Sequence, residues 1–387
     1  MSDSKGFFSK YASLLDDRFD DLVNGVKARL NLHDPLQIVP YRSYGAANRL
    51  YVKGRVLEDK GIGKVTDKDT ILNNLVNMYK RFESDEVPGA EVRMSFEGKD
   101  LKVSTDQEGY FIINLVPTTP IIAEDLWHDV ELELVSAPIP FDANVKAGAE
   151  VLIPPPDAEY GIISDIDDTI IKTGATDILA MSRTVFLNSA RTRLPFAGVS
   201  EFYKSLQLGR NGKRNNPFFY VSSSPWNMYD LLKDFLDLNT IPAGPLLLRD
   251  FGLQDNALIS SGHMGHKFKE IEQILLTYPE LKFVLVGDSG QEDPKIYREV
   301  VKKFPDRILA IYIRDVQLPE REKIAMDISA DLSADKVEMV VVDNTVEAAD
   351  HAAKTGLIFK EAIPAIEEDK AEDKGQKTGK EPLKDLA

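Results

Sequence analysis

Three consecutive prolines, at positions 154 to 156, separate two sequence patterns that favour two different kinds of sheet. From about residue 35 to 157, short segments of alternating apolar and polar residues are separated by turn residues such as Pro88-Gly89. This pattern predicts an antiparallel β-sandwich. From 158 to about 365, apolar strands alternate with helical patterns, which is typical of an α/β domain with a largely parallel sheet. A chain of 387 residues is long enough for both domains.

The strands expected before the prolines are LQIVPY, LYVKGRVL, EVRMSFE, LKVST, YFIINL and VELELV, with one helical stretch at 67–82. Those expected after them are YGIISD, NPFFYVSS, GPLLLRD, LKFVLVGD and RILAIYIRD. Beyond about residue 366 the sequence is charged and poor in apolar residues, so a disordered tail is predicted for 366–387.

Residues 1–34 are expected to form a separate amphipathic helix, because apolar residues recur at steps of three and four from Phe7 to Leu30. Its polar side carries four aspartates, which an anionic membrane surface would repel. We therefore favour a helix that docks on its own protein, or on a second copy as a homo-oligomer contact, over a membrane helix.

Composition limits the classes of partner and the cellular setting. The net charge of −16 argues against a nucleic-acid partner, because duplex binding depends on Lys and Arg. No apolar run is long enough for a transmembrane helix, and no secretory signal is evident. The absence of cysteine excludes disulfides, thiolate metal sites and a cysteine nucleophile. We expect a cytoplasmic protein, with peripheral binding at membranes left open.

The residues that indicate chemistry follow three apolar strands. The first strand runs into Asp165, Asp167 and Asp168, the second into the serines 222 to 224, and the third into Asp288, with Asp293 five residues later. Carboxyl ends of parallel strands are where α/β sheets bind ligands. Neighbouring carboxylates repel unless a cation relieves them, and hydroxyls can bind phosphate oxygens. Each segment alone could be an ordinary polar turn.

Taken together and in this order, the residues Asp165, Asp167, Thr169, Ser222, Lys267, Asp288 and Asp293 resemble the four motifs of the haloacid dehalogenase superfamily. The wider strings YGIISDIDDTI, YVSSSPWN and KFVLVGDSGQEDPKIY are similar to the actin-patch-protein type of phosphatidate phosphatase. The resemblance covers roughly residues 35 to 320. It implies a Rossmann-like core with a minimal cap, and Mg²⁺ as cofactor.

The resemblance also implies roles for these residues. Asp165 would be the nucleophile and Asp167 the general acid and base. Mg²⁺ would be held by Asp165, Asp288 and the backbone carbonyl of Asp167, with Asp293 and Thr169 in support. Ser222 would hold a phosphoryl oxygen and Lys267 would offset negative charge.

Three further residues are expected at the substrate. Ser223 is the middle one of the serines 222 to 224, Trp226 follows these serines, and Arg249 ends a neighbouring strand. Trp226 could equally be a core residue, and Arg249 could form an ion pair with an acid. His263 and His266 are interpreted as polar residues of a loop rather than as two ligands of a metal ion, because a third ligand is missing.

Three functions remain open at this point. The first is a phosphatidate phosphatase acting at a membrane surface, favoured by the resemblance and by the short segment where a cap would lie. The second is a phosphatase of soluble or protein phosphomonoesters on the same core. The third is an interaction protein without activity, which the presence of Asp167 disfavours.

Overall fold

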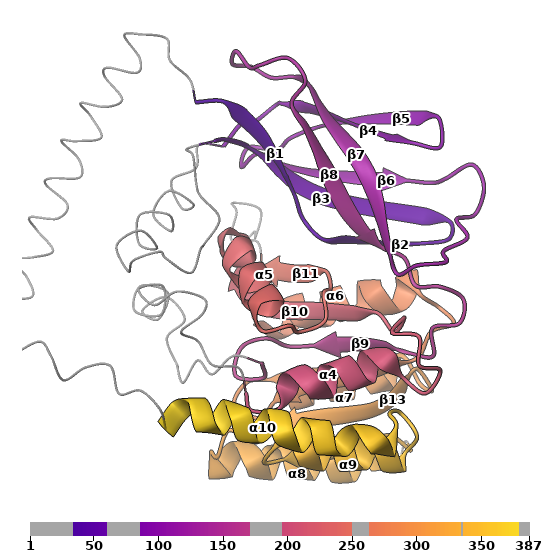
Figure 1. Cartoon of the computed structure of the whole chain (residues 1–387), viewed down its shortest axis with the longest axis vertical. Coiled ribbons are helices and arrows are strands. Elements are labelled where there is room, and N and C mark those ends of the chain that lie inside the picture. The colour runs from indigo at the N-terminus through magenta and orange to yellow at the C-terminus, as the bar shows by residue number, and fades with distance from the viewer. Residues whose placement is uncertain (1–33, 60–85, 171–195, 250–262, 334–335, 379–387) are drawn as a thin grey trace, which may run out of the picture.

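The computed structural model describes residues 34–59, 86–170, 196–249, 263–333 and 336–378. It has a mixed α/β architecture in which an antiparallel sheet lies beside a parallel sheet flanked by helices (Figure 1). The expected helices at 1–34 and 67–82, and the segment expected to replace a cap after Thr169, fall largely or wholly outside the described residues.

The first sheet has eight strands, in the order β1-β3-β2-β8-β7-β4-β5, with β6 paired to the other edge of β3. All of its strand pairs are antiparallel except β2 with β8. The strands are β1 (Leu36–Pro40), β2 (Ser43–Ala46), β3 (Arg49–Glu58), β4 (Glu91–Phe96), β5 (Lys99–Ser104), β6 (Tyr110–Leu115), β7 (Trp127–Ser136) and β8 (Lys146–Leu152).

The core of this sheet follows from the alternation in the sequence. In β7, the residues Val130, Leu132 and Leu134 are buried while the residues between them are not. Their side chains pack in one cluster with Val52 of β3 and Met94 of β4. Because successive side chains of a strand point to opposite faces, the apolar face alone enters this core. The antiparallel part of the prediction is confirmed. The eight strands form one hydrogen-bonded sheet, and its division into a two-sheet sandwich stays a prediction.

The second sheet has six parallel strands in the order β11-β10-β9-β12-β13-β14. They are β9 (Gly161–Ser164), β10 (Phe218–Pro225), β11 (Leu246–Arg249), β12 (Phe283–Asp288), β13 (Ile308–Arg314) and β14 (Glu338–Val342). Strands β9 and β12 are buried along their whole length, as expected for a parallel sheet covered on both faces.

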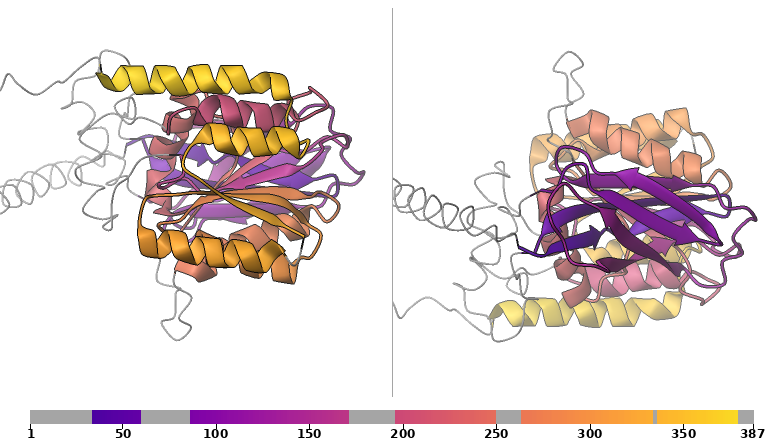
Figure 2. Two further views of the ribbon diagram at one scale, coloured as in Figure 1. Left: turned by 90° about the horizontal axis from the view of Figure 1, so that it is seen from below. Right: turned by 90° about the horizontal axis from the view of Figure 1, so that it is seen from above.

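Helices cover both faces of the parallel sheet, as the two views of Figure 2 show. On one face lie α4 (Val199–Leu208), α5 (Tyr229–Leu238) and α9 (Thr345–Lys354), with α10 (Ile363–Thr378) packed outside α4 and α9. On the other lie α6 (His263–Thr277), α7 (Asp293–Lys303) and α8 (Pro319–Ser333). Two short 3₁₀ turns, η2 (Trp226–Met228) and η3 (Lys360–Ala362), complete the described elements.

The two sheets are joined by specific contacts close to edge strand β11. Tyr41 stacks on Trp226 with ring centroids 5.0 Å apart. The guanidinium of Arg42 donates to both carboxylate oxygens of Asp237, at 2.9 and 3.2 Å. The hydroxyl of Tyr278 donates to the carbonyl of Gly45 at 2.9 Å. The residues before the three prolines therefore help to hold the loop that follows β10.

The structure corrects the prediction for the C-terminal residues. Instead of a disordered tail from residue 366, α10 continues to Thr378, and the side chain of Ile366 is completely buried against the α4–α9 side of the core. Two aspartates of α10 also bind α4: Asp373 accepts a hydrogen bond from the backbone of Gly198, and Asp369 accepts one from Glu201. Among the described helices, none is long and apolar enough to cross a membrane.

Candidate active site at the carboxyl edge of the parallel sheet

The order of strands in the parallel sheet creates one point where the chain changes direction. From β9 it runs to β10 and β11 on one side, and afterwards to β12, β13 and β14 on the other. Ligands of open α/β sheets bind at such a point, outside the carboxyl ends of the strands. Asp165 directly follows β9 and Asp288 is the last residue of β12, so both lie at this point.

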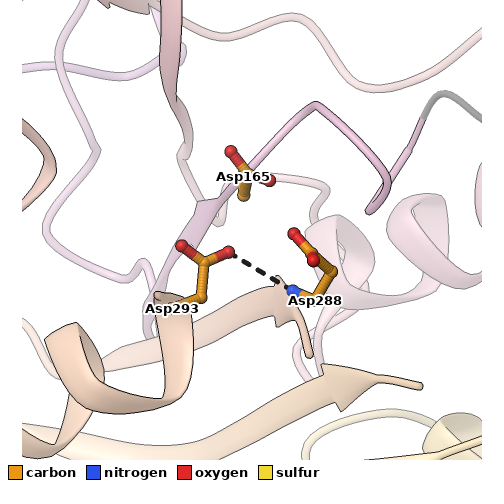
Figure 3. A group of neighbouring side chains, drawn as sticks. All are labelled: Asp165, Asp288 and Asp293. Carbon is orange, nitrogen blue, oxygen red and sulfur yellow. Dashed lines mark hydrogen bonds between the residues drawn. The ribbon is translucent and has the colours of Figure 1, made fainter. Parts of the chain in front are cut away.

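Three carboxylates meet there. One oxygen each of Asp165, Asp288 and Asp293 lie within 4.8 Å of one another, and the three residues are at most 1% exposed (Figure 3). Burial raises the pKa of Asp288 to about 7, with a further contribution from the charge of Asp293. Burial also raises the pKa of Asp165 well above its usual range, against the opposing charge of Lys267. The cluster therefore holds negative charge at a high energetic cost.

Lys267 offsets part of this charge. Its Nζ lies 2.8 Å from Oδ1 of Asp165 and 2.7 Å from Oδ1 of Asp293, and the side chain is buried. Burial alone would lower the pKa of Lys267, but the charges of Asp165 and Asp293 outweigh it and the pKa is raised. The lysine is in the second turn of α6, so the helix delivers its ammonium group to the end of β9.

The loop after β12 positions the other two acids. Oδ1 of Asp288 accepts hydrogen bonds from the backbone N–H groups of Gly290 and Gln291, at 2.7 and 2.9 Å. Oδ2 of Asp293 accepts one from the backbone of Asp288 at 3.3 Å, the contact drawn in Figure 3. Gly287 makes this approach feasible, because a Cβ there would lie 2.5 Å from Oδ2 of Asp293.

The residues of this cluster fit a divalent cation. Three buried carboxylates face a single lysine, which leaves an excess of negative charge. Within the part of the chain that the structure describes, Oδ2 of Asp288 is buried and has no hydrogen-bond partner. Both oxygens of Asp293, in contrast, contact protein donors. Carboxylate oxygens are the ligands that hard divalent cations prefer.

Asp167 has different hydrogen-bond partners from the three clustered acids. Its Oδ2 accepts hydrogen bonds from Oγ of Ser222 at 2.8 Å and from Oγ of Ser224 at 3.1 Å. Its backbone carbonyl accepts one from Nε2 of Gln291 at 3.2 Å. The strand-end serines of β10 thus fix the carboxylate of Asp167, while the loop after β12 fixes its backbone.

Gln291, and the contact of Ser224 with Asp167, are features that the sequence reasoning missed. Gln291 also accepts a hydrogen bond from Lys267 at 3.3 Å, so it joins α6 to the backbone of Asp167. The available signals were weak. Ser224 is the third of three identical residues, and Gln291 lies between Asp288 and Asp293 in GDSGQED.

The remaining expected residues lie in the same region. Thr169 is buried, and its hydroxyl donates to Oδ2 of Asp165 at 3.2 Å. Oγ of Ser223 is buried without a hydrogen-bond partner among the described residues. Asp168, for which the sequence suggests no role, has a φ of 55°, a left-handed conformation that Asp tolerates better than most residues. It gives the turn after Asp167 its shape.

Trp226 and Arg249 do not belong to the acid cluster. Trp226 is 8% exposed and stacks against Tyr41 and Tyr229, whose own ring centroids lie 4.3 Å apart, which agrees with the alternative that it packs in the core. Both residues line a cavity, to which His266 also belongs. The interpretation of His263 and His266 as polar residues of a loop is wrong, because both lie in the first turns of helix α6. Burial, followed by the charge of Arg249, lowers the pKa of His266 to about 4.

Part of the chain is similar in sequence to a known protein family and to known proteins. Residues 160–315 match the family model "Phosphatidate phosphatase APP1, catalytic domain". Phosphatidate phosphatase APP1 of Saccharomyces cerevisiae is 40% identical over 155 residues, which are 40% of this chain and 25% of that protein. An uncharacterized protein of Schizosaccharomyces pombe is 31% identical over 229 residues, which are 57% of this chain and 36% of that protein.

The chain thus spans well under half the length of either relative in its matched part. Among solved structures, a carbohydrate acetylesterase from Xanthomonas citri aligns with 79% of this chain and 68% of its own, at 11% identity and a TM-score of 0.26. At this TM-score the structural alignment supports no inference about fold or function. The sequence match contains every acid of the cluster, both serines that bind Asp167, and Lys267. Within residues 160–315 the chain is therefore similar to the catalytic domain of APP1-type phosphatidate phosphatases.

Proposed function

We propose that the chain is a Mg²⁺-dependent phosphomonoester phosphatase that works through an aspartyl phosphate on Asp165, with phosphatidate as its substrate. The observation that supports this most strongly is the buried cluster of Asp165, Asp288 and Asp293 with Lys267 at the switch point of the parallel sheet. The proposal includes a core of the haloacid dehalogenase type at 158–365, which the parallel order of six strands supports.

In the first half of the reaction, a carboxylate oxygen of Asp165 attacks phosphorus. The O–P bond to Asp165 forms, and the bond between phosphorus and the ester oxygen breaks. Asp167 gives its proton to the leaving oxygen, which departs as an alcohol. For phosphatidate this alcohol is diacylglycerol.

In the second half, water attacks the phosphorus of the aspartyl phosphate. Asp167, now ionised, takes the proton of this water, and the Asp165 carboxylate leaves as inorganic phosphate is released. The hydrogen bonds from Ser222 and Ser224 support this role, because they fix the carboxylate of Asp167 in one orientation.

The other residues bind and orient. Ser222 would donate to a phosphoryl oxygen, Lys267 would offset charge at Asp165, and Thr169 and Asp293 would hold the site in shape. The donor set fits Mg²⁺ at Asp165, Asp288 and the backbone carbonyl of Asp167. When bound, the ion would supply positive charge that stabilises the transferring phosphoryl group.

Phosphatidate is preferred as the substrate because the yeast relative carries that activity in its name. Ser223, Trp226 and Arg249 are proposed to contact it, and the last two line a cavity. A soluble or protein phosphomonoester on the same core is the second candidate. The division at 157, the docking of residues 1–34 and a cytoplasmic, membrane-peripheral location belong to the same proposal.

The deciding experiment is a phosphate-release assay of the purified full chain. Phosphatidate in detergent micelles is compared with glycerol 3-phosphate and a phosphopeptide at matched ester concentration, with Mg²⁺ or with excess EDTA. We expect release from phosphatidate, restored by Mg²⁺ after chelation. A tenfold or greater preference in kcat/KM for a soluble ester, about 1.4 kcal/mol of transition-state discrimination, would favour the second candidate.

A third arm of the assay separates activity from interaction. Asp165→Asn, tested with deamidation excluded by mass spectrometry, should release no phosphate from any of the three esters. If wild type and this variant behave alike on all of them, the chain is not an enzyme of this class. The interaction protein considered from the sequence would then take its place.

A further inference from the structure

A cavity of about 480 Å³ separates the antiparallel sheet from the β11 edge of the parallel sheet. One wall comes mainly from β2 and β3, and the other from β11, Trp226 and one side of α6 along its length. None of the clustered acids lines it. Its volume is in the range of pockets that hold small organic ligands.

The charge of this cavity is opposite to that of the protein. Five of its lining residues are basic and one, Glu270, is acidic, whereas the whole chain has 63 acidic and 47 basic residues. The basic residues are Arg42, Arg49, Lys53, Arg249 and Lys269. Basic groups gathered in a concave site raise the local concentration of anions. The cavity is therefore a local exception in an acidic molecule.

The basic side chains have different surroundings. Arg42 forms ion pairs with Asp237 and Glu150 and so contributes mainly to holding the sheets together. The ammonium of Lys53 lies 3.7 Å from the ring centroid of Trp226. Arg49 on β3 and Lys269 on α6 are exposed and belong to opposite walls. A ligand between the walls would have positive charge on both sides.

Aromatic rings supply the apolar part of the lining. Tyr44 and Tyr51 lie with ring centroids 5.2 Å apart, and Trp226 completes the set on the opposite wall. Pockets for organic ligands combine such surfaces with a few polar groups that fix orientation. Arginine and lysine are the side chains that bind phosphate groups most often.

The cavity is also adjacent to the catalytic residues along the chain. His266 of the cavity precedes Lys267, and Trp226 follows Ser224 by two positions. The low pKa of His266 leaves this histidine neutral near pH 7, so it adds no charge of its own. None of the clustered acids lines the cavity, so a ligand there would leave the acid cluster unoccupied.

We propose that this cavity is a second binding site, in which Arg49 and Lys269 bind the phosphate group of a ligand other than the one that reacts at Asp165, while Trp226 and Arg249 are shared with the substrate. The phosphate can belong to a lipid headgroup or to a soluble compound. The antiparallel sheet then has a defined role: β2 and β3 supply half of a phosphate site. The proposal requires binding only, so it stands or falls independently of the phosphatase activity.

The test measures binding of two phosphodiesters, which are not phosphomonoester substrates. The lipid probe is phosphatidylglycerol in phosphatidylcholine vesicles, and the soluble probe is glycerophosphoglycerol. The full chain is compared with Arg49→Gln/Lys269→Gln. The matched control is Lys102→Gln/Lys146→Gln, which removes two positive charges from exposed positions of the antiparallel sheet outside the cavity.

We expect the cavity variant to weaken binding of at least one probe about tenfold or more, while the control stays within about twofold of wild type. Loss with vesicles alone identifies a lipid headgroup, and loss with both probes identifies the phosphodiester itself. Equal loss in the two variants would mean diffuse surface attraction and would overturn the proposal. The absence of binding to either probe by the wild-type chain would overturn it as well.

Discussion

Ser222 donates a hydrogen bond from its Oγ to Oδ2 of Asp167 across 2.8 Å, joining the ends of β10 and β9. A hydroxyl has one proton to donate. If Ser222 donates that proton to a phosphoryl oxygen, it can no longer donate it to Asp167. Ser224, whose Oγ reaches the same carboxylate oxygen at 3.1 Å, would then hold Asp167 alone.

Ser224 is therefore predicted to position Asp167 during the reaction. We expect Ser224→Ala to lower kcat about tenfold with little change in KM, because the carboxylate loses the donor that remains when substrate is bound. Steady-state kinetics on the substrate identified by phosphate release would measure this.

A control for the loss of a buried serine is Ser205→Ala in α4, where the hydroxyl donates to the carbonyl of Glu201 and lies outside the site. Its unfolding free energy shows what the loss of such a hydroxyl costs the fold. A rise in KM with unchanged kcat in Ser224→Ala would indicate that Ser224 binds substrate instead.

The two central aspartates should respond differently to the same change. Asp165→Asn should abolish turnover, because an amide cannot serve as the nucleophile. Asp167→Asn should reduce kcat by about 10² to 10⁴-fold, the usual contribution of a general acid and base. Trapping radioactive phosphate on the protein after acid quench distinguishes them, since only a chain that retains Asp165 can be labelled. Label on Asp165→Asn would contradict the assignment of the nucleophile.

Gly287 is predicted to be intolerant of a side chain. In Gly287→Ala the new Cβ would lie 2.5 Å from Oδ2 and 2.8 Å from Cβ of Asp293, so Asp293 must move. We expect a loss of about 1 to 3 kcal/mol in the free energy of unfolding, typical of overpacking, together with weaker Mg²⁺ binding in calorimetry. Gly148→Ala is the matched control, because a Cβ there meets nothing within 4 Å. Equal stability of the two variants would show that the loop after β12 yields easily.

His266 should make stability depend on pH. Its pKa is about 4 in the folded protein, below the ordinary value of 6.5, because burial and Arg249 disfavour the charged ring. The unfolded chain therefore binds the proton first, and the stabilisation present above pH 6.5 is lost as the pH falls toward 4.

Between pH 7.5 and 5 this loss is about 2 kcal/mol, because the slope approaches about 1.4 kcal/mol per pH unit only between the two pKa values. Urea unfolding of wild type and His266→Gln at several pH values measures it, since the difference between the two chains removes contributions from other groups. If the difference in unfolding free energy between wild type and His266→Gln stays constant from pH 7 to 5, then folding does not lower the pKa of His266, which contradicts the prediction.

The sequence predicts well the part of the site that lies directly at the ends of strands. The buried strands β9, β10 and β12 have apolar runs that only a covered parallel sheet accommodates, and their last residues must then share an edge. Hence Asp165, Ser222 and Asp288 could be expected together. Ser224 and Gln291 could not, because their role depends on the turn of a loop, which leaves no periodic signal.

Other elements were missed for a different reason. Strand β8 contains Ala147, Gly148 and Ala149, residue types that are depleted in strands, and it forms through its pairing with β7. The helix α10 has a charged sequence that resembles a disordered segment, and a few contacts such as that of Ile366 decide its structure. Tertiary contacts override local preference in both cases.

The stacking of Tyr41 on Trp226 crosses the boundary of the family match, which begins at residue 160. Arg42 crosses it too, through its backbone N–H to the hydroxyl of Tyr229 at 2.6 Å and through its ion pair with Asp237. The segment that follows the serines of β10 is thereby held in place by residues that lie over a hundred positions earlier in the chain. Folding cooperativity then extends beyond the unit that sequence comparison recognises, and loss of Tyr41 or Arg42 would disorder the candidate-site serines without removing any of their hydroxyl groups.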